Sequence, residues 1–274
     1  MTEHTSVRGT IWFRALIGQA SSMPGDPRSV LTADAPLGKE QTRFLCVVPD
    51  PKARFPCARH GEVGLEEGYA LAARVREAME QDKNTTKRPI VAIIDAKSQA
   101  YGRREETAGI FLACAAAIDA YGSARLVGHP VIALVVGQAI SGVPLTHGYQ
   151  ANRILAFDDD GVVIHAMHKA AAARITRRSV EELEQLAKKI PPMSYDVRDY
   201  AKLGLLYKLL HVDNPEKPSE QDIRNVQDEL VGAIADARRG PVDLRNRLES
   251  QGALEMRKAS ILVRRKLETQ WLEN

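Results

Sequence analysis

The stretch that most constrains the fold of this chain runs from Pro130 to Leu145. Residues 130–136 are apolar and rich in β-branched side chains, a pattern typical of a strand buried on both faces. Gly137 follows them, and a second glycine, Gly142, comes shortly afterwards. We therefore predict a strand that stops at Gly137 and turns tightly into a helix. The N–H groups of such a turn can bind an oxyanion, a carboxylate or a phosphate, although an ordinary strand-to-helix connection has the same pattern.

The composition is close to that of an average globular protein and argues against several classes of function. The 274 residues are 44% hydrophobic and 27% charged, enough for one large α/β domain with extensions or for two domains. The 38 basic and 35 acidic residues leave a net charge of +3, which does not predict a nucleic-acid surface. No signal-peptide pattern or membrane-length apolar run is present, and the cysteines have no C-x-x-C spacing. We expect a cytoplasmic protein without membrane or nucleic-acid partners.

The residues before this stretch form strand-helix units. Arg43–Val48 is the first predicted strand, Leu65–Gln81 has the apolar period of a helix, and Pro89–Asp95 is a second buried strand. A β-α-β unit of this kind normally pairs its strands in parallel. An Ala-rich helix over about Glu105–Val127 then leads to the strand at Pro130.

The loops after two of these strands hold the candidate site. Open α/β sheets bind ligands beyond the carboxyl ends of their strands. The polar loop after Asp95 contains Tyr101 and Gly102, and the next strand is followed by residues 137–143. We expect the two loops to meet at one edge of the sheet.

The remaining segments have weaker patterns. Thr10–Leu16 is amphipathic, and Ser21–Pro36 has the composition of a long surface loop. A turn at Asp158–Gly161 separates two short predicted strands. The strand-helix core is expected to end near residue 178, and helices come after it. These segments are the strands Ile154–Phe157 and Val162–Met167, a helical region from the N-cap Ser179 to Tyr207, and helices over Ser219–Ala237 and Leu254–Trp271.

Several enzyme classes do not fit the residues. Ser141 lacks the glycine two positions earlier that a nucleophile elbow requires. His165 and His168 have no acidic neighbour in the order of a zinc-protease motif, and we expect no metal site. Neither of the common glycine-rich nucleotide-phosphate motifs occurs. Glu105 and Glu106, at a predicted helix start, either compensate the helix dipole or orient a substrate.

The same residues resemble a known family. An aspartate-ended strand, a Tyr-Gly loop with paired glutamates at 105–106, and the turn at 137–142 are similar to the carboxyltransferase branch of the crotonase-like superfamily. The string His-Gly-Tyr-Gln-Ala-Asn-Arg at 147–153 and the segment 163–167 resemble more closely the gamma subunits of biotin-independent malonate decarboxylases. The resemblance covers about residues 8–210.

This resemblance implies a fold. It is an α/β, crotonase-like fold of the carboxyltransferase C-domain type, a ββα-superhelix core with a helical C-terminal extension. We place an N-terminal extension and loop in residues 1–40, the core in 41–210, and the helical extension in 211–274.

The resemblance also implies an activity that no single subunit performs. A gamma subunit pairs with a homologous beta subunit, and the pair removes CO2 from a malonyl thioester, through an enolate, to give the acetyl thioester. The substrate is carried on the phosphopantetheine-type group of an acyl-carrier-protein subunit, 2'-(5''-phosphoribosyl)-3'-dephospho-CoA, and an alpha subunit transfers the acyl group. This chain would bind no cofactor itself, and no biotin.

One departure from the carboxyltransferase pattern concerns the turn. Relatives hold the biotin carbonyl with Gly-Gly-Ala amides, whereas the matching positions here are Gly142, Val143 and Pro144. Proline has no N–H to donate. We therefore expect the enolate hole in the partner subunit, while 137–143 wall the pocket and orient the malonyl carboxylate.

The candidate residues are assigned from that division of roles. Gly142, Val143, Gln138 and Ser141 are the candidate catalytic residues. Protonation of the enolate carbon is open between Tyr101, His165 and a water molecule. Contacts to the substrate are expected from Gly137, Ala139, Tyr101, Gly102, Arg103 and His165. Two other functions stay open, a biotin-dependent acyl-CoA carboxyltransferase subunit and a non-catalytic structural partner.

Overall fold

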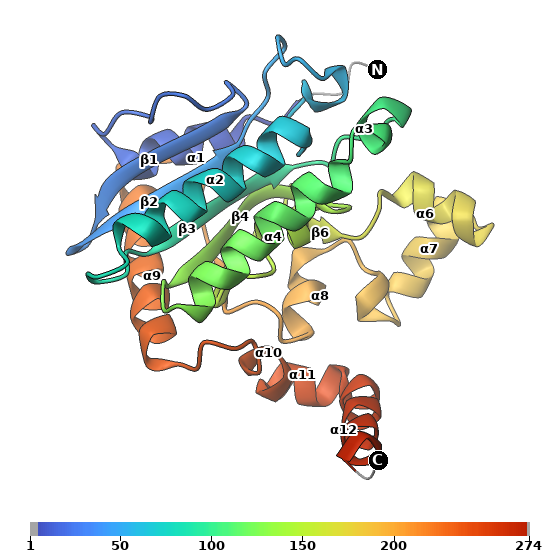
Figure 1. The fold of residues 1–274 in the computed structure, drawn as a ribbon. Coiled ribbons are helices and arrows are strands. Elements are labelled where there is room, and N and C mark those ends of the chain that lie inside the picture. The colour runs from blue at the N-terminus through green and yellow to red at the C-terminus, as the bar shows by residue number, and fades with distance from the viewer. Residues whose placement is uncertain (1–4, 273–274) are drawn as a thin grey trace.

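The computed structural model describes residues 5–272 and has a seven-stranded sheet with helices on both faces (Figure 1). The strands lie in the order β1-β2-β3-β4-β5-β7, and β6 pairs with β4 off this path. Only β1 and β2 are antiparallel, and all other pairs are parallel. The strands are β1 Val30–Leu37, β2 Glu40–Val47, β3 Ile90–Ala96, β4 Val131–Ile140, β5 Arg153–Phe157, β6 Val163–His165 and β7 Lys208–Leu210.

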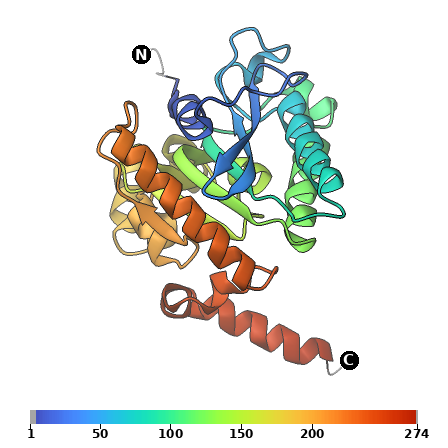
Figure 2. The ribbon, with the colours of Figure 1, turned by 90° about the vertical axis from the view of Figure 1, so that its left-hand side faces the viewer.

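Two layers of helices enclose the sheet. The helices α2 (Leu65–Gln81) and α4 (Ile110–Leu126) pack together on one face, and α1 (Arg8–Ile17) and α9 (Glu220–Arg239) lie on the other (Figures 1 and 2). The short helix α3 (Arg103–Thr107) precedes α4, and α5 (Val143–His147) follows β4. The predicted parallel β-α-β arrangement of β2, α2 and β3 is confirmed.

The core is built around β4. Nine of its ten residues are buried, and neighbouring strands pair with successive parts of it: β5 with residues 132–135 and β6 with residues 138–140. On one face of the sheet, α1 inserts Trp12 against Phe157, with the ring centroids 4.6 Å apart. The Trp12 indole N–H donates to the carbonyl of Pro215, 2.9 Å away. Strand β4 therefore places its carboxyl end, and the turn after it, in a rigid framework.

Three sequence expectations about element boundaries are wrong. Ser21–Pro36 is not a continuous loop, because Val30–Leu37 pairs with all of β2 as an edge strand. The strand at Pro130 does not stop at Gly137, and continues to Ile140. The helix expected over Glu105–Val127 is interrupted at Gly109, whose φ of 84° lies in the left-handed region that favours glycine.

One expectation about the second half is confirmed and one needs correction. The turn at Asp158–Gly161 separates two short strands, β5 and β6, which both pair with β4 rather than with each other. The sheet does not end before residue 178, because β7 adds to β5 in parallel. The proposed domain boundaries at 41 and 210 stay a prediction, although α1 and β1 within residues 1–40 pack as part of the core.

The rest of the chain is helical, as expected. Residues 169–202 form a helical group beside the carboxyl end of β4, and the last helix extends away from the body (Figure 2). Within residues 5–272 no helix is both long and apolar enough to cross a membrane. The helices are α6 Lys169–Thr176, α7 Val180–Ala187, α8 Val197–Lys202, α10 Asn246–Glu249, α11 Gln251–Met256 and α12 Lys258–Leu272.

Candidate active site

The two loops predicted from the sequence to form the site meet, as expected. The Tyr101 hydroxyl contacts the Ser141 hydroxyl, which joins the loop after β3 to the turn after β4. A second contact comes from Gln99, whose Oε1 accepts a hydrogen bond from the Gly142 N–H at 2.5 Å. Both loops follow the carboxyl ends of adjacent parallel strands, which is where ligands bind in sheets of this kind.

Ser141 has an unusual backbone for a residue with a side chain. Its φ is 64°, in the left-handed region, and only Arg177 shares this property among the non-glycine residues that the structure describes. The Ser141 N–H donates to the His165 carbonyl at 2.8 Å, which ties the turn to β6. Such a conformation costs of order 1–3 kcal/mol and persists where the surroundings impose it, often at functional sites.

Helix α5 begins directly after this turn, and its last residue, His147, is hydrogen-bonded to β3 and to α4. Its residue His147 is buried, and its Nε2 lies 3.2 Å from the Ile93 carbonyl of β3. Because a carbonyl can only accept, Nε2 carries the proton and Nδ1 accepts from the Tyr121 hydroxyl of α4 at 2.9 Å. Burial lowers the pKa of His147 to about 4, so the ring stays neutral at neutral pH.

Asp95 fixes the end of β4. Its buried carboxylate accepts hydrogen bonds from the Ser6 hydroxyl at 2.6 Å, the Gly9 N–H at 3.0 Å and the Gln138 N–H at 3.2 Å. Gly137 lies against this carboxylate, and a Cβ there would overlap Oδ1 and lie 2.7 Å from Cγ. Gly137 is therefore required by the packing of Asp95, and its expected place in the pocket wall stays a prediction.

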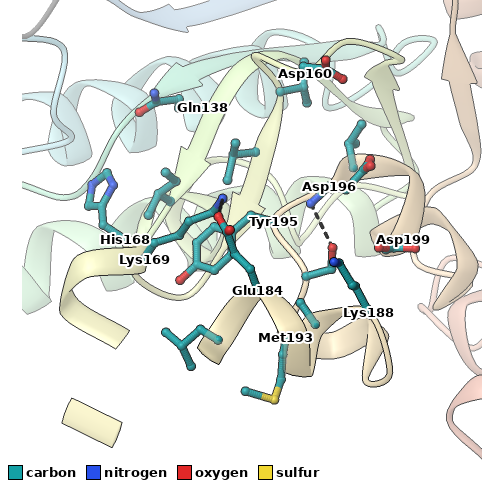
Figure 3. A pocket seen from close by; sticks show the side chains of 17 residues that line it. Gln138, Asp160, His168, Lys169, Glu184, Lys188, Met193, Tyr195, Asp196 and Asp199 are labelled. Atoms are coloured by element: carbon teal, nitrogen blue, oxygen red, sulfur yellow. Dashed lines mark hydrogen bonds and ion pairs between the residues drawn. The ribbon is translucent and has the colours of Figure 1, made fainter. Parts of the chain in front are cut away.

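Beside the turn lies a cavity of about 720 Å³ (Figure 3). It is enclosed by the ends of β4 and β6 on one side and by the helical group at 169–199 on the other. Gln138 and Ile140 of β4 line it, whereas Ala139, between them, faces the core. Its other charged or hydrogen-bonding lining residues are Asp160, His168, Lys169, Glu184, Lys188, Ser194, Tyr195, Asp196 and Asp199.

An ion pair between Lys169 and Glu184 lines the cavity. Lys169 pairs with Glu184 at 2.8 Å, and its Nζ lies 5.4 Å from the centre of the Tyr195 ring (Figure 3). The Tyr195 ring also stacks on His165, with the ring centroids 3.9 Å apart. The His165 Nδ1 is 2.9 Å from the Met167 carbonyl, and burial lowers the pKa of His165 below its ordinary value. His165 is therefore held against Tyr195 and the Met167 carbonyl as a mainly neutral ring.

Two other expected site residues have buried side chains. Val143 and Ala139 both belong to the hydrophobic core, so at most their backbone atoms can reach a ligand. The roles expected for Val143 and Ala139 at the site stay a prediction.

Some residues near Tyr101 are exposed to solvent, and others are buried and pack within the loop. Tyr101 and Arg103 are exposed. A Cβ on Gly102 would overlap Glu105, whose buried carboxylate also hydrogen-bonds Cys57. Glu105 therefore packs within the loop at the start of α3, while Glu106 is exposed.

Comparison with known proteins decides the family. A family model described as the malonate decarboxylase gamma subunit matches residues 58–271. The chain belongs to this family. Two Pseudomonas malonate decarboxylase crystal structures are similar over 97% of this chain and 100% of theirs: a hetero-tetramer in complex with coenzyme A, 55% identical with a TM-score of 0.92, and an MdcD-MdcE hetero-dimer, 54% identical with a TM-score of 0.89.

More distant relatives of this gamma-subunit chain establish the fold class. The Malonomonas rubra malonyl-S-ACP:biotin-protein carboxyltransferase MADD is 37% identical over 193 residues, which is 69% of this chain and 66% of that protein. A transcarboxylase 12S structure is 18% identical with a TM-score of 0.64, over 86% of this chain and 42% of that one. The expected crotonase-like carboxyltransferase fold is confirmed.

Sequence reasoning misses several residues at the loop junction and in the cavity of this malonate decarboxylase gamma-type chain. Gln99 lies two residues before the predicted Tyr101, in the same polar loop, yet no motif marks it. Lys169, Glu184 and Tyr195 come from the helical region, for which the sequence predicts only packing. Lys169 directly follows His168 in the sequence, and no motif marks Glu184 or Tyr195.

The low pKa of His147 makes stability depend on pH. The folded state resists protonation down to about pH 4, whereas the unfolded ring takes up its proton near pH 6.5, so stability is lost as pH falls through this interval. The loss amounts to about 3 kcal/mol. We expect urea unfolding at pH 7 and pH 4.5 to show this decline in the wild type and a smaller one in His147→Gln. Equal declines in the two proteins would contradict the assignment.

Proposed function

We propose that this chain forms one half of a malonyl-thioester decarboxylase and takes part in catalysis beside a homologous beta subunit. The observation that carries the proposal is the junction of the two loops at Tyr101 and Ser141, in a chain of the gamma-subunit family. In the reaction the bond between the methylene carbon and the carboxylate breaks. Its electron pair moves to the thioester oxygen as an enolate, CO2 leaves, and a proton then adds to the carbon.

The role proposed for this chain is to hold the malonyl carboxylate. The Tyr101 and Ser141 hydroxyls lie at the junction, and Tyr101 is 53% exposed. The enolate oxygen needs its own N–H donors, each worth about 3 kcal/mol. The turn after β4 offers few, because Gly142 N–H is bound to Gln99 and Pro144 has none. We therefore place the enolate donors in the beta subunit.

The thioester is proposed to arrive on the phosphopantetheine-type group of an acyl-carrier subunit, which supplies a long, flexible tether. The cavity beside Gln138 is large enough for part of such an arm, and its lining combines apolar residues with Lys169 and His168. We propose no biotin, because the engaged Gly142 N–H and Pro144 remove two of the three N–H donors at the positions that match the biotin-carbonyl site.

The partner is proposed to cover the outer face of α4. This helix is apolar on nearly all sides, and its seventeen residues contain only two charged ones, Asp119 and Arg125. A helix of that composition is normally buried, yet Phe111 is 63% and Leu112 54% exposed. Leu145 of α5, which packs on α4 directly after the turn, is also exposed. This surface borders the site, and the Pseudomonas relative is a hetero-dimer.

The direct test is a decarboxylation assay on the reconstituted complex. The chain is co-expressed with a beta subunit, and CO2 release from a malonyl thioester is followed with and without this chain. We expect turnover only with both chains. A beta subunit that is fully active alone would reduce this chain to a non-catalytic structural role.

The substitution Gly142→Leu tests the role of the turn. A Cβ on Gly142 would lie 2.6 Å from Gln99 Oε1, which is the end of a flexible side chain, so Gly142→Leu should displace Gln99 without unfolding the chain. We expect kcat/KM for decarboxylation by the heterodimer to fall by about 100-fold, mainly through KM, because the polar contacts to the malonyl carboxylate are displaced, while the melting temperature stays unchanged. An unchanged kcat/KM would refute a role for the turn.

A second candidate function is a biotin-dependent carboxyltransferase subunit. It is favoured by the 37% identity with a Malonomonas protein named as a biotin-protein carboxyltransferase. The two functions differ in whether the assembled complex contains biotin. A streptavidin blot of the purified parent complex distinguishes them, and we expect no biotinylated band.

A further inference from the structure

Gln99 occupies the centre of the junction between the two loops. Its Oε1 accepts the Gly142 N–H at 2.5 Å, so the oxygen end of the side chain is already used. A side-chain amide also carries two N–H donors on its nitrogen. Within residues 5–272 the one side-chain hydrogen bond of Gln99 is this bond to its Oε1, none involves its Nε2, and the residue is half-buried. The nitrogen is therefore the end of this amide that remains for a ligand.

The backbone on both sides of Gln99 is fixed. The Val63 N–H donates to the Ser98 carbonyl at 3.1 Å, and the Ala100 N–H donates to the Val63 carbonyl at 2.9 Å. These bonds form a parallel bridge between Val63 and Gln99, and both Ser98 and Ala100 are buried. The side chain thus starts from a rigid position, which reduces the entropy lost when it binds a ligand.

The Gly142 N–H that donates to Gln99 is also fixed in position by its surroundings. The left-handed backbone of Ser141 sets the direction of the next peptide unit, and the bond from the Ser141 N–H to the His165 carbonyl keeps it there. An amide whose oxygen accepts a hydrogen bond is polarised, and its own N–H groups become better donors. The hydrogen bond from the Gly142 N–H therefore makes the Gln99 Nε2–H groups stronger hydrogen-bond donors.

We propose that Gln99 is a substrate-binding residue whose Nε2 donates a hydrogen bond to the carboxylate of the malonyl group. This inference rests on the proposed function and adds a specific donor to it. The Tyr101 hydroxyl, on the same loop, contacts Ser141 beside Gly142, so the junction presents polar groups from both loops. Gln99 supplies the N–H that the turn itself cannot offer at Pro144.

The proposal has a specific kinetic consequence. The carboxylate is charged in the bound substrate and becomes neutral CO2 as the bond breaks. A donor to this group therefore stabilises the bound substrate at least as much as the transition state. Its loss raises KM and leaves kcat nearly unchanged, whereas loss of a donor to the thioester oxygen lowers kcat.

Three substitutions separate the two ends of the amide. Gln99→Glu keeps an acceptor for the Gly142 N–H but has no donor at neutral pH. Gln99→Met keeps the approximate length and loses both functions, and Gln99→Ala exposes the Gly142 N–H. Gln221→Glu is the matched control, because Gln221 is an exposed glutamine of α9 that bonds only its helix neighbours Asn225 and Arg224.

The heterodimer is assayed with the malonyl thioester of N-acetylcysteamine. We expect Gln99→Glu to raise KM by about 10-fold to 100-fold, as for loss of a hydrogen bond to a charged group, with kcat and the melting temperature close to wild type. Gln99→Met should raise KM in the same direction, and Gln221→Glu should change nothing. A fall in kcat at constant KM, unchanged kinetics, or a lower KM in Gln99→Ala, which would mean that Gln99 merely blocks the Gly142 N–H, would each overturn the proposal.

A binding measurement separates this proposal from the proposed function. Malonate carries the same carboxylate, and its affinity for the heterodimer is measured by titration calorimetry. Weaker malonate binding by Gln99→Glu than by wild type supports the role of Gln99 even if the wild-type complex fails to release CO2, a result that would overturn the proposed function alone. Equal affinities, or no binding by the wild type, overturn the role of Gln99 whatever the turnover.

Discussion

Arginine in place of Phe111 is expected to abolish the heterodimer while the chain itself stays folded. Phe111 is on the outer face of α4, where a side chain that is exposed in the isolated chain becomes buried against the proposed partner. Burying an unpaired guanidinium in an apolar interface costs at least about 3 kcal/mol, which weakens association by more than 100-fold. Size-exclusion chromatography with light scattering measures the complex, and circular dichroism checks the fold.

The control for Phe111→Arg uses the other prominent exposed apolar surface. Trp271, near the end of α12, is 85% exposed and lies on the helix that extends from the body (Figure 2). Trp271→Arg should leave the heterodimer intact. If Trp271→Arg instead separated the subunits and Phe111→Arg did not, the interface would lie at α12 and our assignment would be wrong.

Gly137→Ala is expected to cause a larger loss of stability than a single added methyl group usually does. The new Cβ would overlap the Asp95 carboxylate, which is buried and accepts hydrogen bonds from three parts of the chain. Moving Asp95 would leave the Gly9 and Gln138 N–H groups unpaired. Overpacking and lost charge-assisted bonds together cost about 4 kcal/mol or more. We expect a large drop in melting temperature or insoluble protein.

Gly232→Ala provides the matched control for this substitution. Gly232 is inside α9, and a Cβ there would meet no atom within 4 Å. Alanine is favoured over glycine inside a helix by about 1 kcal/mol, so this variant should melt at a higher temperature than wild type. A Gly137→Ala protein as stable as the wild type would show that Asp95 is not held as described.

Local pattern and chain order were enough to predict much of the fold and part of the candidate site. The limits of α2 match the predicted Leu65–Gln81, because its apolar period is bounded by polar turns. The meeting of Tyr101 with the turn at Ser141 was predictable because parallel strands deliver their carboxyl ends to one edge. The family was indicated by a short, specific string, and the comparisons confirm it.

The features that the sequence did not predict depend on contacts between distant residues. Strand β1 contains Asp34 and Pro36, which resemble a loop, but Asp34 pairs with Arg43 of β2 and with Arg88. Gly137 has the sequence signature of a turn, yet it lies within β4. A glycine is required at this position because a Cβ would overlap the Asp95 carboxylate. The partner of the Gly142 N–H is a side chain 43 positions earlier, and spacing alone cannot reveal such a pair.

The packing of α1 has a consequence for how the chain is made. This helix leaves the ribosome early, yet its partners appear much later: Asp95 for Gly9, Phe157 for the Trp12 ring, and Pro215 for the Trp12 indole N–H. At ordinary rates of synthesis the 203-residue separation between Trp12 and Pro215 corresponds to about 10 to 40 s. Until Pro215 has been made, the Trp12 indole N–H lacks its carbonyl partner, so the packing of α1, which also contacts β1, β2 and β3, is completed only after much of the chain has been synthesised.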